Sequence, residues 1–244
     1  MSFWEANREI LQRHYPGLME EITSEGGHTL APQDIKIENS PAGDPSLSVK
    51  GIHVHSPRDP LREGRRLAEA AAGNGAVVIL GFGLGYAAQA AAESGRPVVI
   101  VEKYKELLIK AMELRDMSGL LSQKIIFVIG GTGEGIMNAL AAASELSAGK
   151  PACEKTPSVI RNIALIGLDE EWYGAIENRI RTWTMKDDVN MATFKRFGKR
   201  WVRNLSRNMS AICGFPGISR LAGLAAAAAG GGIIKNRRRN SGNG

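Results

Sequence analysis

Four short apolar runs between residues 76 and 168 constrain the fold more than any other feature of the sequence. The runs are AVVILGF, PVVIVEK, KIIFVIGG and RNIALIGL, and helix-forming segments separate them. Strands that are apolar throughout and alternate with helices are typical of a parallel sheet covered on both faces. The sequence therefore predicts a doubly wound α/β domain, Rossmann-like and methyltransferase-like, over residues 57–170.

The segments on either side of this domain have different patterns. Residues 1–56 predict a small lead-in subdomain, with an amphipathic helix over residues 3–14 followed by two or three short antiparallel strands. Residues 171–215 have a helical period and many Trp, Arg and Lys side chains, which predicts a helical extension. Residues 216–244 are low-complexity Ala and Gly followed by basic residues, and we expect them to be disordered.

Composition limits the function classes further. The 244 residues are 43% hydrophobic, enough for a sizeable core, and carry a net charge of +6 that is concentrated near the C-terminal end. We interpret this charge as a solvated basic face and tail; the alternative is an anionic partner such as a nucleotide, a nucleic acid or a membrane surface. Cys153 and Cys213 form no CxxC pair, no segment is apolar for about 18 residues, and the start lacks a signal-peptide pattern. We therefore expect a cytoplasmic protein without a membrane partner.

The turn GFGLGY is the strongest candidate for a ligand site. It places Gly81, Gly83 and Gly85 between an apolar strand and a helix that begins near Tyr86. Glycines allow a sharp turn and close approach of a ligand, and the helix N-terminus offers free N–H groups. Glu102 ends the next strand, where an acidic side chain can accept hydrogen bonds from a ribose. These five residues predict a binding site for a nucleotide or an S-adenosylmethionine-type ligand. The alternative is a glycine turn that serves helix–strand packing and binds no ligand. The sequence therefore assigns no certain cofactor.

A second glycine turn, GGTGEG, follows the third apolar run. Because carboxyl ends of parallel strands share one edge of a sheet, Gly131 and Gly133 are candidates for lining the same pocket. A flexible loop is the alternative.

The other candidate sites have simpler explanations that involve neither catalysis nor metal binding. His53 and His55 would share one strand face, which suits two ligands of one ion, but no third ligand accompanies them and we predict no metal site. A strand-end histidine and an N-cap at Asp59 account for this stretch. No GxSxG elbow is present, so catalytic residues stay unknown. Basic and aromatic residues near the end of the chain could contact nucleic acid or pack against another domain: Trp183, Lys199, Arg200, Trp201 and Arg203.

The combination of several motifs resembles a known family. His55-Ser56, Asp59-Pro60, Glu63 and Arg66 precede VVILGFGLGY and VIVEK, and this order resembles the N-terminal region of the bacterial motility-associated factor (Maf) proteins. These are flagellin glycosyltransferases grouped with 6-hydroxymethylpterin diphosphokinase-like proteins. The segment RFGKRWVRNLSRNM resembles their helical linker, so the resemblance covers residues 50–215.

The resemblance implies transfer of an activated nonulosonic sugar, such as CMP-linked pseudaminic or legionaminic acid, to flagellin. In such proteins the linker leads into a Gly-Pro-Ser sequence that opens the sugar-nucleotide site, whereas GISRLAGLAAAAAGGG stands here. We therefore expect an N-terminal module without its catalytic domain, with flagellin or that missing domain as partner. The alternatives are a methyltransferase-like enzyme that uses the GFGLGY turn and Glu102, and a nucleic-acid-binding protein that uses the basic helix.

Overall fold

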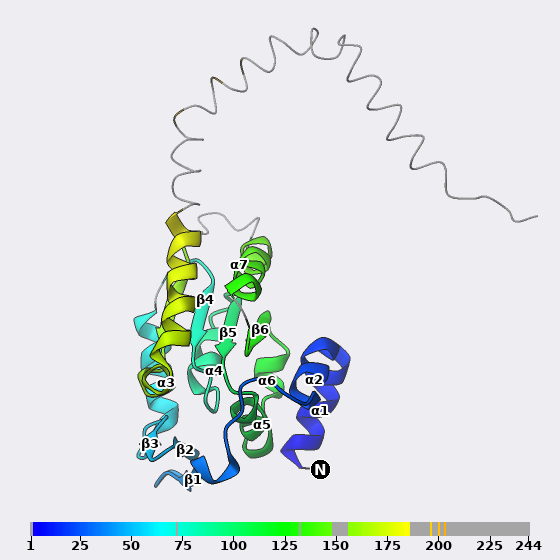
Figure 1. Cartoon of the computed structure of the whole chain (residues 1–244), viewed down its shortest axis with the longest axis vertical. Helices are drawn as coiled ribbons and strands as arrows, with labels where there is room; N and C mark the ends of the chain where they lie inside the picture. The colour runs from blue at the N-terminus through cyan, green and yellow to red at the C-terminus, as the bar shows by residue number, and fades with distance from the viewer. Residues whose placement is uncertain are drawn as a thin grey trace, which may run out of the picture. The chain divides into compact units, whose positions relative to one another are not determined.

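A four-stranded parallel sheet organises the chain (Figure 1). Its strands are β4 (Val77–Leu80), β5 (Val98–Glu102), β6 (Ile125–Ile129) and β7 (Ser158–Arg161), in the order β6-β5-β4-β7. The computed structural model describes residues 2–71, 73–131, 133–147 and 156–185, together with residues 196, 200 and 203. The chain divides after residue 187, and this fold is that of residues 1–187.

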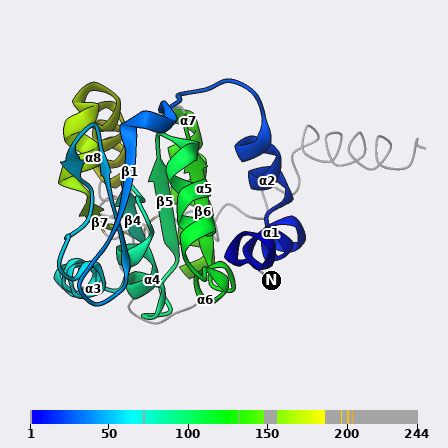
Figure 2. The same cartoon turned by 90° about the horizontal axis from the view of Figure 1, so that it is seen from below.

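The strand order places helices on both faces of the sheet. Chain order runs outward from β4 to β6 and then returns to β7 on the far side of β4, so the connections cross in opposite directions. Helices α3 (Pro60–Ala70) and α4 (Tyr86–Ala92) cover one face, and α7 (Gly133–Ser147) and a helix over residues 170–185 cover the other (Figures 1 and 2). The predicted doubly wound fold is confirmed.

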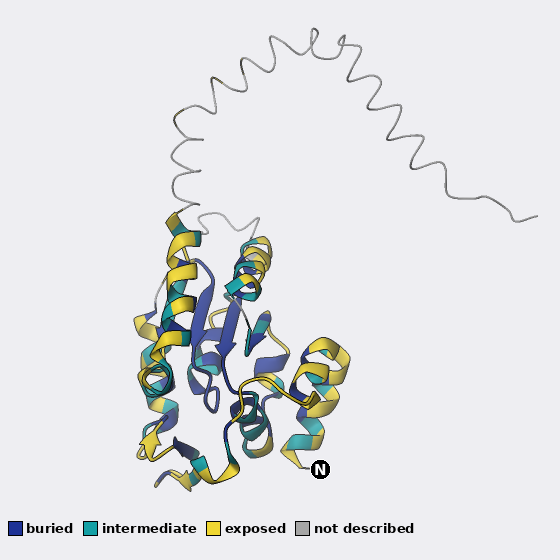
Figure 3. Ribbon diagram, viewed as in Figure 1, coloured by how far each residue is buried: buried dark blue, intermediate teal, exposed yellow. Residues whose placement is uncertain are grey.

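Burial explains why the strands are apolar throughout. The residues of β4 are at most 1% exposed, and Val98 through Val101 of β5 are fully buried. Figure 3 shows the central strands as the continuous buried layer of the molecule. Because covering helices exclude water from both faces, polar alternation is absent from these strands.

The lead-in contains the predicted helix and antiparallel strands. Helix α1 spans Phe3–His14 and begins at a capping box between Ser2 and Glu5. The chain then forms α2 (Pro16–Thr23), since a proline is tolerated in the first turn of a helix. A 3-10 turn and three strands follow, and these elements are η1 (Pro32–Asp34), β1 (Ile35–Asn39), β2 (Pro45–Val49) and β3 (Ile52–His53).

Two short helical elements complete the sheet connections. Helix α5 (Lys105–Leu114) follows β5, and α6 (Ser118–Leu121) precedes β6. Asn7 of α1 joins the lead-in to this region, because its amide donates to the carbonyls of Met112 and Arg115 and its oxygen accepts from Met117 N. The lead-in is thereby fastened to the α/β layer by buried hydrogen bonds.

The predicted strand RNIALIGL is wrong. Strand β7 ends at Arg161, and Ile163–Leu168 form helix α8 instead. The side chain of Asn162 accepts a hydrogen bond from Leu165 N at 3.3 Å and so caps this helix. Within the described residues, no helix is long and apolar enough to cross a membrane. The predicted disorder of residues 216–244 concerns a segment outside the described residues.

Candidate functional site

The Glu102 carboxylate lies inside the glycine turn. Its Oε2 accepts hydrogen bonds from Phe82 N at 2.7 Å and Gly83 N at 3.4 Å. Its Oε1 accepts from Tyr104 N at 3.1 Å and the Tyr173 hydroxyl at 3.3 Å. Full burial raises the pKa of Glu102, and these four donors act in the opposite direction. A ribose would have to displace an internal donor to reach either oxygen.

His55 holds the turn from the other side. Its Nε2 accepts a hydrogen bond from Leu84 N at 2.7 Å. Gly83 has a φ of +56°, and a Cβ added to it would collide with the imidazole, so the turn requires glycine at this position. Burial, reinforced by the positive charge of Arg115, lowers the pKa of His55 to about 3. The ring is therefore neutral at physiological pH, and Nε2 is free to accept.

The backbone donors of the glycine turn are all used within the chain. Gly81 N donates to Val101 O at 2.9 Å, and Gly85 N donates to Phe82 O at 2.9 Å. Together with the bonds to Glu102 and His55, these give every amide from residue 81 to 85 a protein acceptor. A phosphate or carboxylate bound on this turn needs such amides unpaired. The turn therefore offers a ligand no unpaired amide between residues 81 and 85, and we call it the closed turn.

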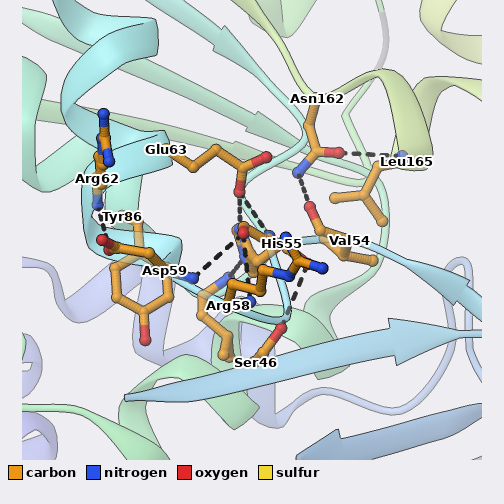
Figure 4. Close-up of polar contacts among 12 residues, drawn as sticks. Ser46, Val54, His55, Arg58, Asp59, Arg62, Glu63, Tyr86, Asn162 and Leu165 are labelled. Carbon is orange, nitrogen blue, oxygen red and sulfur yellow. Dashed lines mark hydrogen bonds and ion pairs between the residues drawn. The ribbon is translucent and has the colours of Figure 1, made fainter. Parts of the chain in front are cut away.

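Hydrogen bonds within residues 55–63 form a clamp that positions the His55 side chain (Figure 4). Ser56 N donates to Glu63 Oε2 at 2.8 Å, and the same oxygen lies 3.9 Å from Nδ1 of His55. Ser56 Oγ accepts from Asp59 N at 3.2 Å. Asp59 accepts from Arg62 N at 2.8 Å, which confirms the predicted N-cap of α3. These contacts hold the connection between β3 and α3 against the glycine turn.

Arg115 and Tyr86 support the same turn. The Arg115 guanidinium donates to Leu84 O and lies 3.7 Å from the centroid of the Tyr86 ring. The Tyr86 hydroxyl donates to Pro45 O at 2.6 Å, and the residue is 3% exposed. Sequence reasoning missed Arg115, because it follows α5 without any motif around it.

A cavity of about 280 Å³ opens at the carboxyl ends of β4 and β7. These are the strands between which the chain order reverses, the place where open α/β sheets bind ligands. Five predicted site residues line it, namely His55, Glu63, Arg66, Gly81 and Tyr86. An adjoining hollow of about 330 Å³ is lined by Ser56, Asp59, Arg62, Glu63 and Arg66. The structure therefore gathers the motif residues and the first glycine around one place.

The other predicted residues lie outside the lining of this cavity. Gly83, Gly85 and Glu102 belong to the closed turn, and Gly131 and Gly133 follow β6. A Cβ on Gly133 would lie 2.8 Å from Arg179 Nε, so the helix over residues 170–185 covers the start of α7.

The sequence did not predict two of the polar residues that line the cavity, Arg161 and Asn162. Both follow β7, and the wrong strand assignment hid their position at the strand end. Asn162 donates to Val54 O at 3.2 Å and so ties the end of β7 to the β3 connection. In the parts of the chain that the structure describes, no three His, Cys, Asp or Glu side chains gather as a metal site.

Comparison with known proteins gives a solved structure with a similar fold and a distantly related sequence. No family model matches the sequence. The chain is similar to the solved structure of a Maf glycosyltransferase from Magnetospirillum magneticum AMB-1, with a TM-score of 0.52 and 14% identity over 75% of this chain. The chain spans only 35% of that protein. An uncharacterized protein from Treponema pallidum (strain Nichols) is 25% identical over 234 residues, covering 92% of this chain and 77% of its own length. The chain therefore shares a Maf-like fold.

Proposed function

We propose that this chain is the N-terminal module of a Maf-like glycosyltransferase involved in flagellin glycosylation. In this proposal the module binds the acceptor protein, and the transfer of a nonulosonic sugar takes place elsewhere in the enzyme. The observation that carries the proposal is the Maf-like fold, combined with a glycine turn whose amides are bonded to the chain itself.

The closed turn argues against a nucleotide-dependent reaction at this position. A methyltransferase-like site needs open amides at the glycine turn and an accessible acid at the next strand end. Here Glu102 is fully buried and accepts four internal hydrogen bonds, while Leu84 N is bonded to His55. Binding S-adenosylmethionine would require opening this buried cluster, which favours a recognition module.

The extent of the similarity agrees with acceptor binding and sugar transfer taking place in different parts of the enzyme. The chain aligns with 35% of the solved glycosyltransferase, so most of that protein has no counterpart in the alignment. We assign the sugar-nucleotide chemistry to such additional regions. The proposed partners of the module are flagellin and a catalytic domain that holds the CMP-linked sugar.

A binding and transfer experiment tests the proposal. The purified 244-residue chain is mixed with flagellin and CMP-linked pseudaminic acid; complex formation is followed by calorimetry and product by intact mass. The expected result is a complex with flagellin and no sugar added. A non-flagellar protein of matched size and charge is the control. Sugar transfer by this chain, or no difference between flagellin and the control, would contradict the proposal.

A further inference from the structure

The cavity between β4 and β7 has an apolar interior. Val54, Ile79, Phe82 and Ile160 line it and are at most 4% exposed. Apolar walls exclude water, so polar interactions at the edge of such a cavity are stronger than they would be on an open surface. The interior can therefore hold the carbon skeleton of a small ligand.

Arg66 supplies a guanidinium group among the residues that line the cavity. Arg66 belongs to α3, and among the described residues no carboxylate lies within ion-pair distance of it. Arg161 also lines the cavity, but its Nε is bonded at 2.5 Å to Glu177, on the helix that covers the other face of the sheet. Guanidinium groups bind carboxylates and phosphates through paired hydrogen bonds. The arrangement favours one acidic group on the ligand.

Glu63 adds an acceptor beside Arg66. Its Oε2 is occupied by Ser56 N, whereas Oε1 has no donor among the described residues. The side chain is 30% exposed. A free carboxylate oxygen accepts hydrogen bonds from hydroxyl groups, so a hydroxyl on the ligand would find an acceptor here.

We propose that this cavity binds a small polyhydroxylated organic anion, in which Arg66 holds the acidic group and Glu63 accepts a hydroxyl. A volume of about 280 Å³ lies at the small end of ligand pockets, which suits a single sugar carrying a carboxylate or phosphate and not a dinucleotide. The inference goes beyond the proposed function and does not depend on it, because a recruiting module needs no small ligand.

Amide NMR titration of the whole chain tests this site with three probes: glucuronate, glucose 1-phosphate and glucose. At millimolar concentration at least one anion should shift the amides of Arg66, Arg161 and Asn162, and glucose should not. The anion that binds more tightly shows whether the site prefers a carboxylate or a phosphate. Failure of both anions, or equal shifts with glucose, would overturn the proposal.

Two neighbouring arginines on α3 supply a matched pair of variants. Arg66→Gln should weaken binding of the anion at least about tenfold, which corresponds to 1.4 kcal/mol. Arg65→Gln makes the same charge change on the same helix, but Arg65 lines a different hollow, and binding should stay at the wild-type value. Equal effects of the two variants would show that the anion responds to overall charge only. Flagellin binding is measured separately, so the two proposals fail independently.

Discussion

Protonation of His55 should release the glycine turn, and the free-energy change follows from the environment of the imidazole. Nε2 accepts from Leu84 N, so this bond requires the unprotonated ring. Burial, together with the charge of Arg115, lowers the pKa of His55 from 6.5 to about 3. The ring also lies near the carboxylate of Glu63, whose Oε2 is 3.9 Å from Nδ1.

The sign of the effect is set by proton binding in the two states. Between pH 6.5 and about 3 the unfolded chain binds a proton at His55 and the folded chain does not. The free energy of unfolding therefore falls as pH falls, by about 1.4 kcal/mol for each unit below 6.5. The expected loss is about 2 kcal/mol at pH 5 and approaches about 5 kcal/mol near pH 3.

Urea unfolding of three proteins isolates this contribution. Wild type, His55→Gln and His53→Gln are compared at about pH 7.5 and about pH 5, where the linkage predicts a difference of about 2 kcal/mol. Glutamine can supply a non-titrating acceptor in place of Nε2. Burial raises the pKa of Glu102, so that group destabilises the fold as pH rises, but it is present in all three proteins.

One outcome of this comparison would contradict the role assigned to His55. Wild type and His53→Gln should lose about 2 kcal/mol more than His55→Gln on acidification, because His53 lies on the exposed edge strand β3. If all three lose the same free energy, His55 is not the neutral acceptor for the turn. In that case the clamp described for His55, Ser56 and Glu63 would not hold the glycine turn.

Three further predictions concern the same turn. Gly83→Ala should destabilise the fold by at least about 2 kcal/mol more than Gly95→Ala. Both positions have a left-handed φ, but only a Cβ at Gly83 would collide with His55. Equal losses of unfolding free energy in urea would contradict this prediction. Glu102→Gln should cost about 2 kcal/mol or more, since it leaves buried amide donors unpaired, whereas exposed Glu113→Gln should have little effect; chemical unfolding measures both. S-adenosylmethionine should leave thermal stability unchanged, while a ligand at one hundred times its Kd would add about 2.7 kcal/mol.

Local signals predicted much of the fold. The apolar runs located β4, β5 and β6, and Asp59 with Pro60 predicted the start of α3. The segment IALIGL misled the interpretation, because its apolar residues suit a strand or a helix equally well. Asn162 determines the outcome, because its side chain caps a helix at a position that the predicted strand includes.

Long-range contacts explain why the roles of the site residues could not be predicted. Glu102 does end β5, as expected, but its partner Tyr173 lies 71 residues further along the chain. His55 and Leu84 are 29 residues apart, and neither has a local pattern that reveals the other. Spacing therefore identified the acid and the glycines, whereas the three-dimensional packing determines whether they face a ligand or each other.

Amide hydrogen exchange at Phe82, Gly83 and Leu84 in the free protein tests the central claim most directly. If Glu102 and His55 close the turn, these three amides exchange only through global unfolding, at rates that match the most protected amides of β4 and β5. Rapid exchange of these amides, at the rate of an exposed loop, would show that the turn is open and available to a ligand.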